Sequence, residues 1–159
     1  MQQALHGGEI VPCCLLCALC QGLDRPRIAD ELLPVWLPEV TQRALVAVMR
    51  RLHLICHAHG QSPTMAGVPP AGVPALSRAW GLNMAFQQRV SLAKARLGTT
   101  NVAELLEAMD EAAGAGADVS ALLGGLRFLP LGRFFDGAGV DIYPQALAAH
   151  ATPATGAAA

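Results

Sequence analysis

Cysteine and histidine are the residues of this sequence best suited to chemistry, and each type forms a cluster. The first cluster holds four of the five cysteines within eight residues: Cys13, Cys14, Cys17 and Cys20. On an α-helix these side chains would cover an arc of about 120°, so all four thiols would share one face. Thiolates bind zinc or iron–sulfur clusters and also form disulfides. The cluster therefore indicates a soft-metal or thiol-redox site as one interpretation.

The residues between these cysteines favour a second interpretation. They are Leu15, Leu16, Ala18 and Leu19, which suit a regular buried helix, and a straight helix does not aim three thiols at one tetrahedral metal ion. A cysteine in such a helix behaves as a small hydrophobic residue. We expect the four cysteines to line a helix–helix contact, with metal binding or redox chemistry as the alternative.

The second cluster consists of His53, Cys56, His57 and His59. His53 and His57 are one helical turn apart, a spacing that can chelate a transition metal. The zinc-protease pattern needs a glutamate directly after the first histidine, and Leu54 occupies that position. Cys56 and His57 are consecutive, so their side chains diverge on a helix and do not form a nucleophile–base pair. We predict a solvated helix end whose histidines complement the helix dipole.

The remaining candidate residues do not converge on an active site. Four carboxylates are predicted to lie on the outer face of one helix, where they keep it soluble: Glu104, Glu107, Asp110 and Glu111. Basic and aromatic residues alternate at Arg127, Phe128, Arg133, Phe134 and Phe135. These side chains could bind nucleic acid or a partner's groove, but we expect the phenylalanines to complete the core. We predict no catalytic, cofactor-binding or metal-binding residue.

Composition limits the classes of partner. The chain has 159 residues, enough for one domain, with 53% hydrophobic and only 14% charged residues. Alanine accounts for part of the apolar surplus and aromatics for only 4%, so we expect a thin core that other protein subunits support. A net charge of −1 provides no field that attracts nucleic acid or an anionic membrane. Nucleic-acid binding is therefore disfavoured.

Hydropathy and cysteine usage predict a cytoplasmic protein. The most apolar uncharged stretch, Ile10 to Leu23, contains Pro12 and is shorter than the ~20 residues that span a bilayer. The first nine residues lack the basic segment of a secretory signal. An odd number of cysteines, four of them crowded together, is unlike the disulfide framework of secreted domains. A peripheral membrane protein, anchored by this stretch or by lipidated cysteines, is a third alternative.

Apolar residues at three- and four-residue steps predict most of the elements. The strongest pattern, from Pro38 to His59, has one apolar stripe comprising Val40, Ala44, Leu45, Val48, Leu52, Ile55 and Cys56. Asn101 and Glu104 form a variant of the capping box that begins a helix. The other helices are predicted over Cys13 to Leu19, with Pro12 in the first turn, and over Arg25 to Leu33, Ala75 to Leu97, Val102 to Ala113 and Pro144 to His150.

These elements predict an all-α fold, an irregular bundle of four to five helices. Residues 1–150 form a single helical domain, and a proline-rich connector, residues 61–74, joins two long antiparallel helices. The stretch from Leu126 to Tyr143 has no helical period and is predicted to be an irregular C-terminal lid. Residues 151–159 are mostly small and are predicted to be a disordered tail.

The predicted function is that of a non-catalytic helical subunit or adaptor that docks on other proteins within a larger assembly, including a homo-oligomer. The low charge, the apolar surplus and the long connector favour it. The alternative from a different class is a metal-binding or thiol-redox protein that uses the cysteine-rich first helix.

Overall fold

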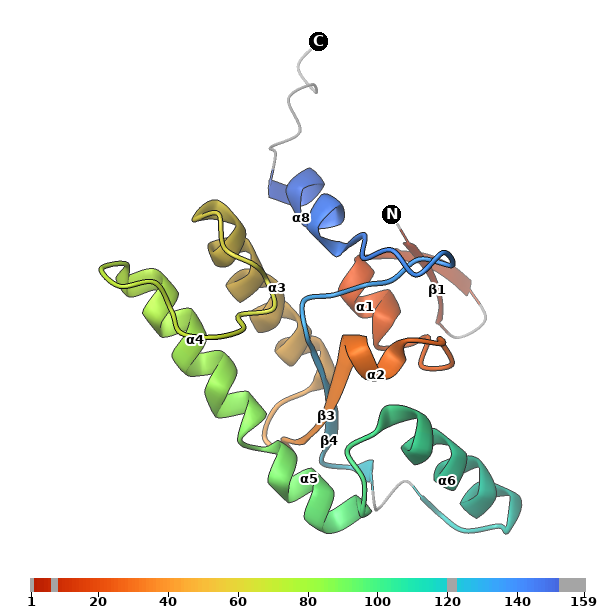
Figure 1. The fold of residues 1–159 in the computed structure, drawn as a ribbon. Coiled ribbons are helices and arrows are strands. Elements are labelled where there is room, and N and C mark those ends of the chain that lie inside the picture. The colour runs from red at the N-terminus through yellow and green to blue at the C-terminus, as the bar shows by residue number, and fades with distance from the viewer. Residues whose placement is uncertain (1, 7–8, 120–122, 152–159) are drawn as a thin grey trace.

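Helices surround a short two-stranded sheet at the centre of the molecule (Figure 1). The computed structural model describes residues 2–6, 9–119 and 123–151, with side chains from residue 14 onward. In chain order the elements are β1 (Gln2–His6), β2 (Glu9–Cys13), α1 (Leu15–Leu19), α2 (Ile28–Glu31), β3 (Leu32–Trp36), α3 (Gln42–Ala58), α4 (Pro74–Gln87), α5 (Val90–Leu97), α6 (Val102–Gly114), β4 (Leu126–Pro130) and α8 (Tyr143–Ala151).

The prediction of an all-α fold is wrong, because four segments of the described residues form strands. β3 pairs antiparallel with β4, with Leu32 opposite Pro130 and Trp36 opposite Leu126. β1 and β2 form a separate antiparallel pair. The chain is therefore a helix-rich fold that contains two small sheets.

The predictions around the central sheet are wrong because they treat proline as a residue that ends an element. The helix expected over Arg25 to Leu33 is only the single turn of α2, and the chain then continues as β3 through Pro34. In a two-stranded sheet each strand has an outer edge, so a proline that cannot donate a hydrogen bond is tolerated there. The expected irregular lid likewise begins with a strand, β4, which ends at Pro130.

A side chain covers the outer edge of β4. Pro34 lies opposite Phe128, and the backbone N–H and carbonyl of Phe128 both bond to the side-chain amide of Gln42, each at 2.8 Å. The Gln42 side chain therefore makes the two hydrogen bonds that a neighbouring strand would make with Phe128. Because Gln42 is the first residue of α3, this pair of bonds also fixes the start of α3 against the sheet.

The first helix is shorter than predicted. Pro12 lies in β2 rather than in the first turn of a helix, and α1 begins only after Cys14. The Cys14 sulfur accepts a hydrogen bond from the backbone N–H of Cys17 and so caps the helix. Pro12 follows Ile10 and Val11, two β-branched residues that favour a strand.

Two separate cores meet at α3, which is buried along two stripes. Leu45, Met49, Leu52 and Cys56 pack with β3, β4, α4 and the connector. A second stripe, about 100° round the helix, includes Val46 and faces α1, α2, α6 and α8. The helix is therefore buried beyond the single apolar stripe that the sequence predicts.

The second long helix is interrupted. A turn at Gln88 and Arg89 divides the expected helix over Ala75 to Leu97 into α4 and α5. α3 and α4 run in opposite directions, as predicted (Figure 1). The connector is ordered: Pro63 and Met65 are buried, and the Trp80 indole donates to the Gly67 carbonyl at 3.2 Å.

The remaining helices follow the predictions closely. α6 begins where the sequence indicates, and the Asn101 side chain accepts from the N–H of Ala103 at 2.9 Å. α8 occupies Tyr143–Ala151, close to the predicted final helix. Residues 152–159, most of the predicted disordered tail, lie outside the described residues.

A buried carboxylate joins α2 to the segment that leads into α8. Glu31 is completely buried and receives two hydrogen bonds from the Arg25 guanidinium, at 3.0 and 2.7 Å. It also accepts the backbone N–H of Phe135. Arg25 in turn donates to the Phe135 carbonyl at 2.6 Å and stacks on the Phe134 ring at 3.6 Å. Three groups of the distant Phe134–Phe135 segment are thereby held around one charge pair.

Replacing Glu31 by alanine should lower the free energy of unfolding by about 3 kcal/mol, because the change leaves the Arg25 charge and the Phe135 N–H without their partner. Urea denaturation of the variant and the wild type measures this difference. Asp30→Ala is the matched control: its ion pair with Arg27 is exposed, so its effect should stay below about 1 kcal/mol. Equal effects of the two substitutions would contradict this role of Glu31.

Gly132 should tolerate alanine less well than Gly139 does. Both have a left-handed backbone, with φ of 74° and 79°, so both variants carry the same cost of about 1–2 kcal/mol. A Cβ at Gly132 would lie 2.5 Å from the Pro63 carbonyl oxygen, whereas a Cβ at Gly139 meets nothing within 4 Å. Gly132→Ala should therefore cost a further ~1–3 kcal/mol in denaturation experiments. Equal costs would show that the connector yields freely at Pro63.

Candidate functional site

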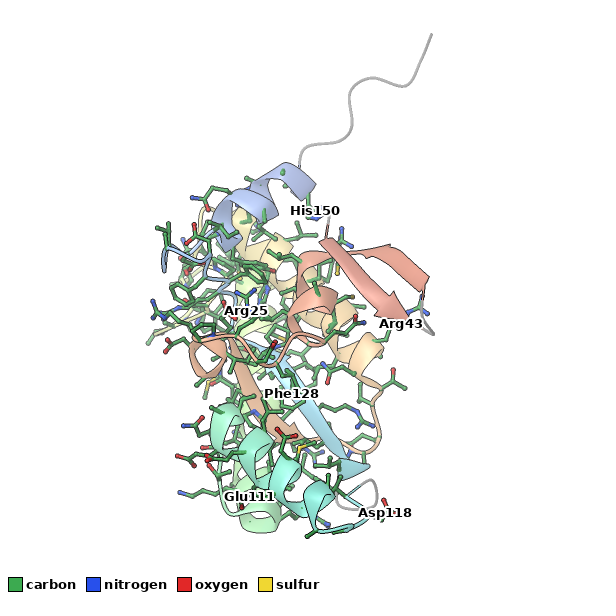
Figure 2. The ribbon with its side chains drawn as sticks, turned by 90° about the vertical axis from the view of Figure 1, so that its right-hand side faces the viewer. Arg25, Arg43, Glu111, Asp118, Phe128 and His150 are labelled. Atoms are coloured by element: carbon green, nitrogen blue, oxygen red, sulfur yellow. The ribbon has the colours of Figure 1, made fainter. Side chains whose placement is uncertain are left out.

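A groove of about 870 Å³ lies between α6 and the segment that contains α2. Its apolar lining comes from Leu23, Ile28 and Leu106. In Figure 2, α6 crosses the lower part of the molecule with Glu111 on it, and Arg25 lies above. The volume is in the range of pockets that hold a ligand or a peptide side chain.

Acidic side chains dominate the charge of this groove. Asp24 lies on one side, and Glu107, Asp110 and Glu111 lie on α6. All four are exposed, and within the described part of the chain none of them forms an ion pair. The positive charge of Arg25, which also lines the groove, is already compensated by Glu31. The groove therefore combines an apolar floor with uncompensated negative charge.

Two cysteines of the first cluster lie close together, but the prediction that all four share one face of a helix is wrong. Cys13 belongs to β2, and Cys14 and Cys20 flank α1. The Cys14 and Cys17 sulfurs are 3.1 Å apart, and both residues are half-buried. Cys20 is held differently: its thiol lies 3.9 Å from the Phe128 carbonyl, and the Gln42 amide donates to its sulfur at 3.4 Å. The side chain of Cys13 lies outside the described residues.

Burial suppresses ionisation of two other thiols. Burial, together with the neighbouring Cys17 and Cys14, raises the pKa of Cys20 to about 12. Cys56 lies in the core with no exposed surface, and burial raises its pKa to about 11. Both residues therefore remain protonated thiols at neutral pH and are poor nucleophiles.

The structure contradicts the solvated-helix interpretation for part of the histidine cluster. His53 is fully buried on the second stripe of α3, and its Nδ1 lies 2.7 Å from the Tyr143 hydroxyl. Its Nε2 has no hydrogen-bond partner among the described residues. His57 is half-buried, and only His59 is exposed at the helix end. The cluster is thus divided between the core and the surface.

Burial shifts the ionisation of both partners in the His53–Tyr143 pair. It lowers the pKa of His53 to about 3. It also raises the pKa of Tyr143, an effect that Cys14 increases and Arg50 opposes. Both side chains are neutral at pH 7, so their contact is a neutral hydrogen bond that positions α8 on α3.

Neither sequence cluster forms a metal centre in the described part of the chain. No three His, Cys, Asp or Glu side chains among those residues are arranged to hold an ion. Two of the basic and aromatic residues in and after β4, Arg127 and Phe134, have structural roles, whereas Arg133 is exposed. Arg127 donates to the carbonyls of Val40, Gly124 and Leu126, and Phe134 is buried in the core as predicted.

Sequence reasoning missed the residues that organise these sites. Gln42, Glu31 and Tyr143 have no distinctive spacing, and each acquires its role through a contact with a distant segment. For the groove, the sequence predicts the acidic face of α6 but gives no sign that this helix lies opposite Leu23 and Ile28. The CxxC spacing of Cys14 and Cys17 was visible in the sequence.

No family model, curated protein or solved structure matches this chain significantly. Within the described residues, none of the helices combines the length and the hydropathy that crossing a membrane requires. Any functional assignment therefore depends on the geometry of the chain itself.

Acidification should destabilise the protein through His53. The folded state keeps His53 neutral down to pH ~3, whereas the unfolded state binds a proton below about pH 6.5. The free energy of unfolding is therefore highest above about pH 6.5, where His53 is neutral in both states. It falls as the pH drops towards 3, by about 2 kcal/mol between pH 7 and pH 5. His53→Leu should remove this part of the pH dependence in urea denaturation. His59→Gln, at the exposed helix end, should preserve it, and the same slope in all three proteins would contradict the assignment.

Proposed function

We propose that this chain is a non-catalytic docking module, a subunit or adaptor that binds a basic amphipathic segment of a partner protein in the groove between α2 and α6. The observation that carries the proposal is the combination of an apolar floor with four exposed carboxylates that have no ion-pair partner among the described residues. An amphipathic segment with apolar anchors and flanking Lys or Arg matches both features.

Charge distribution supports a cationic partner despite the nearly neutral whole chain. The net charge is −1, yet three of the acidic residues follow each other along one side of α6: Glu107, Asp110 and Glu111. At physiological ionic strength exposed charges act over about 8 Å, so the local cluster rather than the net charge determines the approach of a partner.

The exposed apolar residues elsewhere support the groove as the docking site. Leu82 and Met84 on α4 are 40% and 51% exposed, but they are two residues apart and therefore lie about 200° from each other around the helix. Scattered apolar residues of this kind are normal on a surface. The groove concentrates its apolar side chains between charged rims, as an interface does.

A cytoplasmic location is part of this proposal. The described cysteines Cys14, Cys17, Cys20 and Cys56 form no disulfide with one another, which is typical of proteins in a reducing compartment.

Selection from a displayed library of random peptides against the full chain tests the proposal. The enriched peptides should carry net positive charge and apolar residues at helical spacing. Their affinity should fall at least tenfold for the double variant Glu107→Gln with Asp110→Asn, because two attractive charges at the groove are lost, and should fall with added salt.

Asp30→Asn with Glu39→Gln provides the matched control. It removes the same number of negative charges from exposed ion pairs outside the groove, and the affinity should stay within about twofold of wild type. Enrichment of neutral or acidic peptides, or equal losses in the two double variants, would refute the groove as a basic-segment site. A peptide-independent dimer in light scattering whose contacts cover α6 would identify a second copy as the occupant instead.

A further inference from the structure

We infer that Cys14 and Cys17 form a redox-active dithiol, which is oxidised to an intramolecular disulfide by exchange with a low-molecular-weight disulfide of the glutathione type. The inference is independent of the docking groove, because it depends on other residues. These residues lie where α1, α3 and α8 meet. It assigns a chemical role to the cysteine cluster that the proposed docking function does not use.

The geometry of the two sulfurs is the first step. They are 3.1 Å apart, about 1 Å more than a disulfide bond length. Cys14 has an extended backbone just before α1, and Cys17 lies in the first turn, where its N–H donates to the Cys14 sulfur at 3.4 Å. A small rotation of the side chains therefore suffices for bond formation, with no separation of α1 from its neighbours.

Access distinguishes the roles of the two cysteines. Cys14 lines a small cavity of about 20 Å³ between α1, α3 and α8, together with Arg50, Tyr143 and His150. Both thiols are half-buried, but Cys14 lines this cavity and Cys17 is not among its lining residues, so we assign Cys14 as the thiol that attacks an external disulfide. Arg50 and His150 beside it are compatible with the carboxylates of glutathione. Cys17 is then the resolving thiol.

The other described thiols are unsuited to this chemistry. Cys20 is held by Gln42 and the Phe128 carbonyl, and Cys56 is enclosed in the core. Their raised pKa values keep them protonated at neutral pH, whereas the attacking species in thiol–disulfide exchange is the thiolate. The exchange is therefore confined to Cys14 and Cys17 among the described cysteines.

The exchange balances in two steps. The Cys14 thiolate attacks one sulfur of the external disulfide RSSR, which breaks the S–S bond, forms a mixed disulfide Cys14–S–S–R and releases RS⁻. The Cys17 thiolate then attacks the Cys14 sulfur and expels the second RS⁻. The two protons lost by the cysteines go to the two released thiolates, so RSSR is reduced to two RSH while the dithiol is oxidised.

Intact-mass thiol counting tests the inference on the full chain. The reduced protein is equilibrated with glutathione and glutathione disulfide at a series of ratios, quenched with acid and alkylated. Wild type should lose two of its five thiols without retaining glutathione, and Cys20→Ser and Cys13→Ser should also lose two. Cys17→Ser should retain one glutathione on Cys14. Cys14→Ser should carry at least tenfold less adduct and form no disulfide.

The wild-type measurement alone can overturn the inference, so the test does not depend on folding of the variants. Retention of all five thiols at every glutathione ratio would exclude a redox-active pair. Disulfide formation that persists in Cys14→Ser, or disappears in Cys13→Ser or Cys20→Ser, would assign the chemistry to a different pair. Circular dichroism of each variant at the same pH confirms that the compared proteins are folded.

Discussion

The carboxylate of Glu31 lies where the N-terminal and C-terminal parts of the chain meet, and its need for partners organises both. A buried charge is tolerated only when it is paired and hydrogen-bonded, and here Arg25 and the Phe135 N–H meet that requirement. Arg25 then holds the Phe135 carbonyl and covers Phe134. The backbone carbonyl of Glu31 accepts the N–H of Leu131, which aligns the end of β4 with the end of α2.

The two proposed sites depend on this junction in different ways. The Arg25 side of the groove is fixed because Arg25 is held by Glu31, so the charge that faces a partner comes from Asp24 and α6. On the other side, the segment after Phe135 leads to Tyr143, whose hydroxyl meets His53 on α3. α8 therefore lies against the cavity that Cys14 lines. The proposed docking and thiol sites therefore have no lining residue in common.

The sequence predicted elements whose signals are local and failed where a distant contact decides. The capping residue Asn101 and the apolar stripe of α3 require only neighbouring residues. The cap is confirmed, and the stripe is confirmed at Leu45, Leu52 and Cys56, although its member Ala44 is exposed. The burial of His53 could not be predicted, because a single amphipathic stripe gives no sign that α1 and α8 cover the adjacent face. β3 was missed for the same reason: Pro34 argues against a strand unless a partner is known to pair on its other edge. The proximity of Cys14 to Cys17 follows from their spacing, whereas the groove requires the tertiary fold.

The pairing of β3 with β4 also bears on how this chain folds. The two strands are separated by α3, α4, α5 and α6, so pairing them closes a very long loop. The chain loses the entropy of this loop before any strand–strand hydrogen bond compensates for it. Contacts of this kind slow folding relative to a simple helical bundle of the same length. Before the sheet forms, α3 can pack on α4 through local contacts, but Gln42 has no strand edge to bind. Because β4 lies between β3 and the Gln42 side chain, the hydrogen bonds on both of its edges require this long loop to be closed.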